Sequence, residues 1–244
     1  MISDYPNQRN YFIFDGVPSL DFELFVNGNK TFSGASANLT FNQIPGKTGD
    51  ILQFDNRYAN TEISYNSWIA KDMRINLRAL RSFLLSRTSY RMLEDTYHPD
   101  EFRLAVFSGG LDVDVSFENT FAEFDIVFNC KPQRFLKSGE LEKVVTSATD
   151  QIYNPTYFPS KPLIRIFGNG TLTIGNRQIQ VSNNANNFVD IDCDIMDAYT
   201  GYTNRNADIQ TSDNEIFTIE PGMVGIGKTS GISSVIIKPR WFEM

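Results

Sequence analysis

A strand-like segment in which large apolar residues recur at every second position, and which stops abruptly at a proline, constrains the fold of this chain more than any other feature. Large apolar residues occupy Phe124, Ile126 and Phe128, and they alternate with Asp125, Val127 and Asn129. Successive strand side chains point to opposite faces of a sheet, so this pattern predicts a strand with one core face and one partly polar face. Pro132 follows, and proline lacks the N–H that a ladder needs. We therefore expect pairing to end at Lys131-Pro132 and the chain to leave the sheet there.

The first half of the chain reads as short antiparallel strands with one helix. Asp72 is a candidate helix cap, and the apolar residues after it have helical spacing. These helix residues are Ile75, Leu77, Leu80, Phe83 and Leu84. Strands are expected at residues 11–14, 22–26, 90–93, 102–107 and 111–117. The last two are expected to form a hairpin through residues 108–110, where two glycines make a compact turn signal.

Residues 37–64 are poor in apolar side chains and contain a turn signal at their centre, Pro45-Gly46-Lys47-Thr48-Gly49-Asp50. This pattern predicts a long two-stranded arm rather than a unit with its own core. Such an arm needs a partner to cover it, and we expect residues 41–58 to lie against a neighbouring copy of the chain. The candidate inter-subunit residues are Ile44, Pro45, Gly46, Gly49, Asp50, Ile51, Leu52 and Phe54.

The second half predicts an antiparallel β-sandwich. Short apolar segments at 163–167, 171–174, 177–181, 188–193, 215–219 and 233–237 are separated by glycine-containing turns. Residues 133–159 are polar and interrupted by prolines, which indicates a connection between domains. We place the boundary near residue 140, giving domains 1–140 and 141–244. The last residues are candidates for a return to the first domain.

Composition excludes several classes of function. The net charge of -7 and pI of about 4.8 disfavour a nucleic-acid surface, which needs clustered Lys and Arg. Cys130 and Cys193 lie too far apart for metal-ligand spacing and are expected to be buried free thiols. The start of the chain lacks a signal peptide, and no apolar run is long enough to span a membrane. These features predict synthesis in a cytosol and no membrane partner.

Three motifs suggest chemistry but have simpler explanations. Gly222–Thr229 matches the phosphate-binding G-x-x-x-x-G-K-T formula, yet a strand-like segment follows where a helix is required, so its glycines are expected to shape turns.

Asp190, Asp192 and Asp194 alternate like the first ligands of a calcium loop, but the required Gly and Glu are absent. We expect them on a solvated strand face, with Ile191, Cys193 and Ile195 facing inward. His98 is the single histidine and is expected in a turn or interface. The sequence thus predicts no catalytic residue, no cofactor and no metal site.

The order of several motifs along the whole chain resembles the distal tail proteins (Dit) of long-tailed, non-contractile phages that infect Gram-positive bacteria. The motifs include Phe14-Asp15-Gly16, the Pro45–Asp50 turn and Phe128-Asn129-Cys130-Lys131-Pro132. Further ones are Pro162–Gly170, Glu220-Pro221-Gly222-Met223 and Ile237-Lys238-Pro239-Arg240-Trp241. One departure is Asn154-Pro155, which stands where many relatives have Asn-x-Gly and affects only the local turn.

The resemblance implies a mainly β protein at the virion tail tip. Its N-terminal domain would form a ring, usually of six copies, and a galectin-like sandwich would project outward. The implied partners are the tail tube protein, the tail-associated lysin and receptor-binding or other baseplate proteins, and the implied role is structural, not enzymatic. The alternative is a carbohydrate-binding or glycan-cleaving β protein at the cell envelope. Against it, Phe outnumbers Tyr 20 to 10 and there are 2 Trp, a composition typical of core packing.

Overall fold

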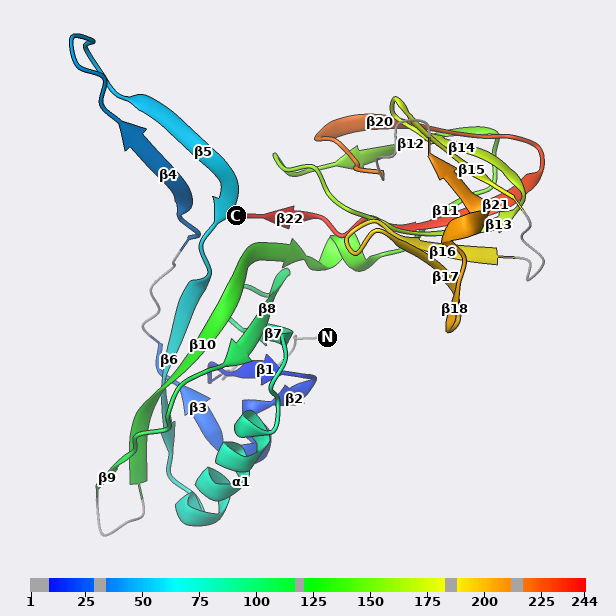
Figure 1. Ribbon diagram of the computed structural model, residues 1–244. Coiled ribbons are helices and arrows are strands. Elements are labelled where there is room, and N and C mark those ends of the chain that lie inside the picture. The colour runs from blue at the N-terminus through cyan, green and yellow to red at the C-terminus, as the bar shows by residue number, and fades with distance from the viewer. Residues whose placement is uncertain (1–8, 29–33, 117–120, 183–187, 212–216) are drawn as a thin grey trace. The chain divides into compact units, whose positions relative to one another are not determined.

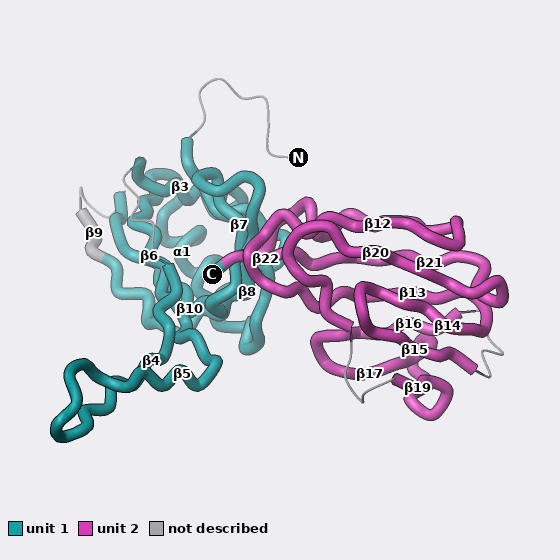
Figure 2. Tube along the Cα trace, turned by 90° about the horizontal axis from the view of Figure 1, so that it is seen from above, with its two compact units in different colours: residues 1–134, 244 teal, residues 135–243 magenta. Residues whose placement is uncertain are grey.

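The computed structural model describes residues 9–28, 34–116, 121–182, 188–211 and 217–244, with side chains of 114–116 not described. The chain divides into two compact units, Met1–Arg134 with Met244, and Phe135–Glu243 (Figure 2). The sequence predicted a domain boundary near residue 140, whereas in the structure unit 2 begins at Phe135. The mainly β architecture expected from the sequence is confirmed.

Unit 1 is a curled antiparallel sheet with one helix (Figure 1). The strand order is β2-β1-β7-β8-β10-β6-β3, and β9 pairs with β10. An isolated bridge joins Asn10 to Val26 of β3, so the strand at one edge of the sheet approaches the segment that precedes β1. The elements are β1 (Phe12–Phe14), β2 (Val17–Pro18), η1 (Ser19–Phe22), β3 (Leu24–Val26), β4 (Ala37–Asn42), β5 (Ile51–Tyr58), β6 (Thr61–Ile69), α1 (Met73–Leu85), β7 (Arg91–Asp95), β8 (Glu101–Phe107), β9 (Asp114–Ser116) and β10 (Phe121–Leu136).

Strand β10 confirms the predicted core face and corrects the predicted end. Phe124, Ile126 and Phe128 are buried, while Asp125 is exposed. The strand continues through Pro132 to Leu136. Pairing with β6 does end at Cys130↔Thr61, so the missing N–H of Pro132 lies beyond the β6 ladder and costs no bond there. The ladder with β6 therefore ends before Pro132 is reached, and the strand itself continues past the proline.

Helix α1 packs Met73, Leu80 and Leu84 into the core of unit 1. The predicted helix is confirmed, with two corrections. Ile75 is 71% exposed rather than part of the buried side. Asp72 stands at the cap position in the left-handed region, with φ 47°, and its side chain makes no capping bond. The predicted hairpin between residues 102–107 and 111–117 is also wrong, because β8 pairs with β7 and β10 while β9 pairs with β10.

Unit 2 is a sandwich of two antiparallel sheets around one apolar core. The six-stranded sheet has the order β11-β21-β13-β16-β17-β18, and the five-stranded sheet has the order β12-β20-β14-β15-β19. The elements are η2 (Lys137–Glu140), β11 (Lys143–Val145), β12 (Thr149–Asn154), β13 (Leu163–Gly168), β14 (Gly170–Ile174), β15 (Arg177–Val181), β16 (Phe188–Asp192), β17 (Asp197–Thr200), β18 (Thr203–Asn204), η3 (Asn206–Asp208), β19 (Ile209–Thr211), β20 (Gly222–Lys228), β21 (Ile232–Lys238) and β22 (Phe242–Glu243).

Several predictions for the second half need correction. Residues 133–159 are not a linker, because β11 and β12 belong to the two sheets of the sandwich. The strand expected at 215–219 begins outside the described residues, and its described end forms one bridge, between Ile219 and Ser160. Trp241, which lies beyond the last strand predicted for the sandwich, is buried in the sandwich core. A galectin-like topology remains a prediction.

Candidate assembly surface

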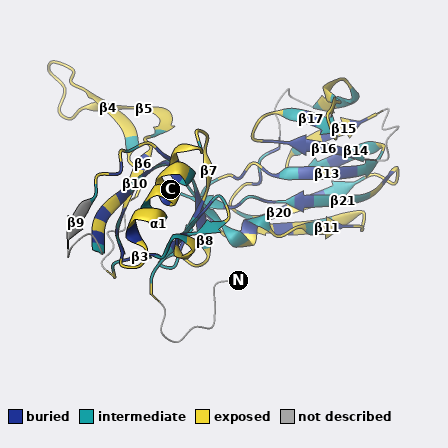
Figure 3. Cartoon of the chain, turned by 90° about the horizontal axis from the view of Figure 1, so that it is seen from below, coloured by how far each residue is buried: buried dark blue, intermediate teal, exposed yellow. Residues whose placement is uncertain are grey.

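The arm is a two-stranded sheet of its own, formed by β4 and β5. Figure 1 shows it extending away from the rest of unit 1, and Figure 3 shows that it is exposed along its length. The turn between its strands contains Gly46 and Gly49, both with positive φ, at 84° and 86°. Glycine adopts this backbone conformation without strain, which explains the two glycines in the predicted turn.

The pairing register gives the arm two different faces. Leu39 pairs with Phe54, and Phe41 pairs with Leu52. Directly opposed residues of an antiparallel pair share a face, and positions two apart on one strand also share it. These four side chains therefore form one continuous apolar face, which we call the arm face. The opposite face carries Thr40, Asn42, Gln53 and Ile51.

The arm face is exposed to solvent in the single chain. Phe41 is 63% exposed and Leu52 is 55% exposed. Leu39 and Phe54 are 41% and 38% exposed, and the ring of Phe54 packs edge-on against Tyr58 at 5.6 Å. An exposed apolar cluster of this kind is a candidate interaction surface.

The structure places the predicted arm residues in three groups. Leu52 and Phe54 lie on the arm face, whereas Ile51 lies on the opposite face. Ile44, Pro45, Gly46, Gly49 and Asp50 lie in the exposed turn. The candidate residues did not include Leu39 and Phe41, which complete the arm face, although Phe41 begins the segment expected to contact a neighbour. Their spacing of two within 37–42 was a strand signal, but its meaning depended on the register with β5.

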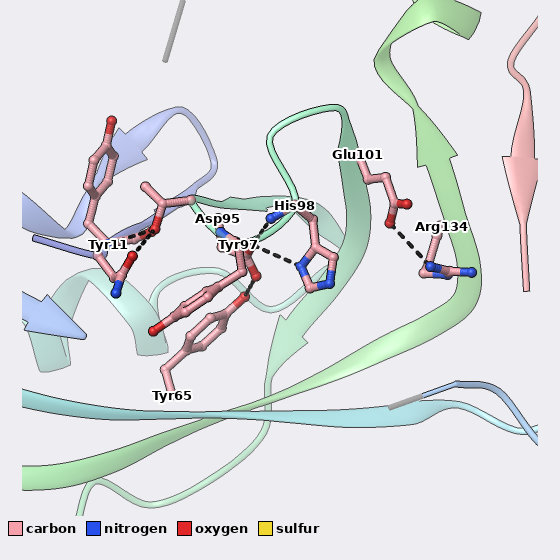
Figure 4. Close-up of polar contacts among 9 residues, drawn as sticks. Tyr11, Tyr65, Asp95, Tyr97, His98, Glu101 and Arg134 are labelled. Atoms are coloured by element: carbon pink, nitrogen blue, oxygen red, sulfur yellow. Dashed lines mark hydrogen bonds and ion pairs between the residues drawn. The ribbon is translucent and has the colours of Figure 1, made fainter. Parts of the chain in front are cut away.

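A second cluster, buried in unit 1, is built on Asp95 at the end of β7 (Figure 4). Its Oδ2 accepts a hydrogen bond from the Tyr65 hydroxyl at 2.6 Å. Its Oδ1 accepts backbone N–H bonds from Tyr97 and His98 at 3.0 and 2.9 Å, and lies 3.0 Å from Nδ1 of His98. Burial, followed by the charge of Asp95, raises the pKa of Tyr65 well above its usual value. The cluster ties the turn after β7 to β6, and it places the single histidine in a turn.

The aspartates of β16 are not on a solvated face, contrary to the prediction. Asp190 and Asp192 are both buried. Each accepts two hydrogen bonds from an arginine: Arg165 binds Asp190 at 2.6 and 2.9 Å, and Arg240 binds Asp192 at 2.7 and 3.0 Å. Burial alone would raise the pKa of Asp192, but the Arg240 bonds and the N–H of Asp194 lower it below the usual value.

Of the three apolar residues that alternate with these aspartates, two are buried and one is exposed. Ile191 and Cys193 face the core as predicted, whereas Ile195 is 63% exposed. Burial raises the pKa of the Cys193 thiol to about 12. Cys130 is also a buried free thiol. Among the described residues, no group of three or more His, Cys, Asp or Glu is arranged to hold a metal ion.

The phosphate-loop match lies in a strand. Gly222–Lys228 is β20, and the Lys228 ammonium donates to the carbonyl of Ile232 at 2.7 Å. The strand–loop–helix setting that a nucleotide needs is therefore absent at this motif. The expectation that its glycines shape turns is wrong for Gly225 and Gly227, which lie within the strand. In the described part of the chain, no helix is long and apolar enough to cross a membrane.

The two-unit fold, with a curled sheet, one helix, an arm and a sandwich, is similar to folds of solved phage tail proteins. The chain is similar to the Dit protein of phage SPP1, described as a hub of the adsorption apparatus of phages that infect Gram-positive bacteria. That likeness has a TM-score of 0.70 at 15% identity and covers 97% of this chain and 100% of the other.

Two structures of the phage P2 baseplate in its activated conformation are also similar. The structure with Ca has a TM-score of 0.54 at 11% identity, covering 94% of this chain and 97% of that one. The structure with Sr has a TM-score of 0.53 at 11% identity, covering 95% and 97%. No protein-family model and no curated protein matches the sequence. At these identities the comparisons establish the fold.

Proposed function

We propose that this protein is a structural hub at the tip of a phage tail. Copies of the chain assemble into a ring of six, which joins the tail tube protein to the tail-associated lysin and to receptor-binding or other baseplate proteins. Its place is then the virion, after synthesis in the cytoplasm of the bacterial host. The full-length likeness to a phage hub protein supports this role.

The observation that carries the proposal is the arm face. Leu39, Phe41, Leu52 and Phe54 form an apolar surface on a two-stranded sheet that lacks a core of its own. An isolated two-stranded hairpin is marginally stable in water, so covering this face stabilises the arm as well as the contact. A neighbouring copy of the chain is the occupant that we propose.

A contact between the arm of one copy and another surface of the next is heterologous, and such contacts close into rings when the rotation fits. An obligate ring contact buries more than about 2,000 Å² in total. The arm face therefore supplies only part of such an interface.

We also propose that the role involves no catalysis. The His98 ring lies against Asp95, and Asp190 and Asp192 are held by arginines, so these groups serve the fold. Buried charges held in this way are stabilised by their partners and are poorly placed to transfer protons to a substrate.

Light scattering over a concentration series, combined with negative-stain electron microscopy, tests the ring. We expect a closed annulus with the mass of six chains, alone or after addition of the tail tube protein from the same phage. A protein that stays monomeric at all concentrations, both alone and with that partner, would contradict the proposal.

A further inference from the structure

The two outer faces of the unit 2 sandwich differ in chemical character. The six-stranded sheet carries charged pairs, such as Arg165–Asp190 on β13 and β16. The described outward positions of the five-stranded sheet carry no charged side chain, and we call this surface the neutral face. Its residues, placed by strand register and burial, are Thr149, Gln151, Tyr153, Thr171, Thr173, Gln178, Gln180, Gln210, Met223, Gly225 and Gly227.

The lack of charge on the neutral face is unusual for a solvent-exposed surface. About 25–35% of surface residues are ordinarily charged, so a face of this size would carry about three charges. Its polar groups are side-chain amides and hydroxyls. Within the described part of the chain, the side chains of Gln151, Gln178, Gln180 and Gln210 make no hydrogen bond, so they are available to a ligand.

Two glycines leave part of the neutral face without side chains. Gly225 and Gly227 are successive outward positions of β20, between Gln151 of β12 and Thr173 of β14. A Cβ at Gly225 would meet nothing within 4 Å, and one at Gly227 would meet only Thr173 Cβ at 3.8 Å, an ordinary contact. Neither backbone has the left-handed φ that favours glycine. Glycine weakens a strand, so the stability of the fold does not explain why glycine occupies these two positions. A ligand that approaches the backbone closely would explain both glycines.

We propose that the neutral face binds an uncharged oligosaccharide. Each sugar hydroxyl both donates and accepts, and glutamine amides and threonine hydroxyls supply both functions. Tyr153 is 60% exposed beside Met223 at one edge, where its ring offers a flat apolar surface with a polar tip. An anionic ligand is disfavoured because the face supplies no cation. A protein is disfavoured because protein interfaces have an apolar and aromatic centre, whereas the centre of this face is glycine, glutamine and threonine.

The test begins with the full-length protein on an array of neutral glucose, galactose and N-acetylglucosamine oligosaccharides, printed beside sialylated and phosphorylated versions. We expect binding to neutral members only. The strongest neutral binder is then titrated calorimetrically against Gly225→Thr, which fills the bare strip. We expect affinity to fall at least about tenfold, a change of about 1.4 kcal/mol, while the thermal midpoint stays the same or rises.

Gln151→Ala, which removes one amide, should also weaken binding. Val144→Thr is the matched control, because it changes an exposed strand residue of the other sheet; its affinity should equal that of the wild type. The proposal is overturned if no neutral oligosaccharide binds at millimolar concentration, if only charged glycans bind, or if Gly225→Thr binds normally. Loss of a protein partner by Gly225→Thr without any glycan binding also overturns it. None of these results bears on ring assembly, which is tested separately by substitutions on the arm face.

Discussion

The apolar arm face makes a quantitative prediction about assembly. Complete burial of a Leu or Phe side chain contributes about 1.5–3 kcal/mol. Phe41 is 63% exposed and Leu52 is 55% exposed, so covering each by a neighbour contributes about 1–2 kcal/mol. Changing both to Ser should remove about 2–3.5 kcal/mol from each contact, which raises the dissociation constant per contact about 30- to 300-fold.

The same change should leave the single chain almost as stable as before. The arm is a separate sheet and Phe41 lies outside the core of unit 1. Exposed substitutions usually alter stability by less than about 0.5 kcal/mol, or about 2 °C in thermal midpoint for a chain of this size. Mass photometry over a dilution series measures assembly, and differential scanning fluorimetry measures stability.

The matched control changes the other face of the same hairpin. Thr40 and Gln53 pair directly, next to the Phe41–Leu52 pair. Thr40→Ser with Gln53→Ser should shift the dissociation constant less than about threefold. Equal weakening by both double variants would refute the assignment of the arm face. A large loss of monomer stability in the Phe41 and Leu52 variant would refute it too, by showing that the arm packs on its own body.

Three further predictions concern unit 2 and its packing. Gly139→Ala should lower the free energy of unfolding, measured in urea, by about 1–3 kcal/mol, because a Cβ there would lie 2.3 Å from the backbone N of Trp241. Gly110→Ala is the control, and it should cost far less because a Cβ there would meet nothing within 4 Å. Cys193, with its pKa raised to about 12, should resist thiol reagents at pH 8 until the protein unfolds; rapid modification of the native protein would contradict its burial. Folding lowers the pKa of Asp192, so the stabilisation that its carboxylate provides is present above about pH 4 and is lost as the pH falls further. The Asp192→Asn variant lacks this carboxylate. Its urea midpoint should therefore depend less on pH below about pH 4 than the wild-type midpoint does.

Local sequence pattern was sufficient for the elements whose evidence lies in neighbouring residues. The alternation at Phe124, Ile126 and Phe128 predicted a half-buried strand, and β10 has that face in the core. The helix and the two-stranded arm were also recognised, the arm because the glycines of its turn mark a reversal of the chain. Periodicity is local, so it survives in whatever tertiary setting the segment finds.

Partners distant in sequence were beyond such reasoning. Arg165 meets Asp190 across β13 and β16, and Arg240 reaches Asp192 from beyond the end of β21. From sequence, Asp190 and Asp192 looked like part of a solvated face because their arginines lay 25 and 48 positions away, whereas Asp194 is exposed as predicted. Likewise, β9 pairs with β10 rather than with its predecessor, and Pro132 lies within a strand.

The sequence by itself determined the strand-rich architecture, the single helix and the existence of an arm, because alternation, helical spacing and turn residues act over a few residues. Only the tertiary structure decided which face of the arm is apolar, because Leu39 and Phe41 join Leu52 and Phe54 through the register of β4 with β5. It also decided that one outer face of the sandwich is free of charge in its described part. A face is assembled from strands that are far apart along the chain, and its character appears only once those strands are paired.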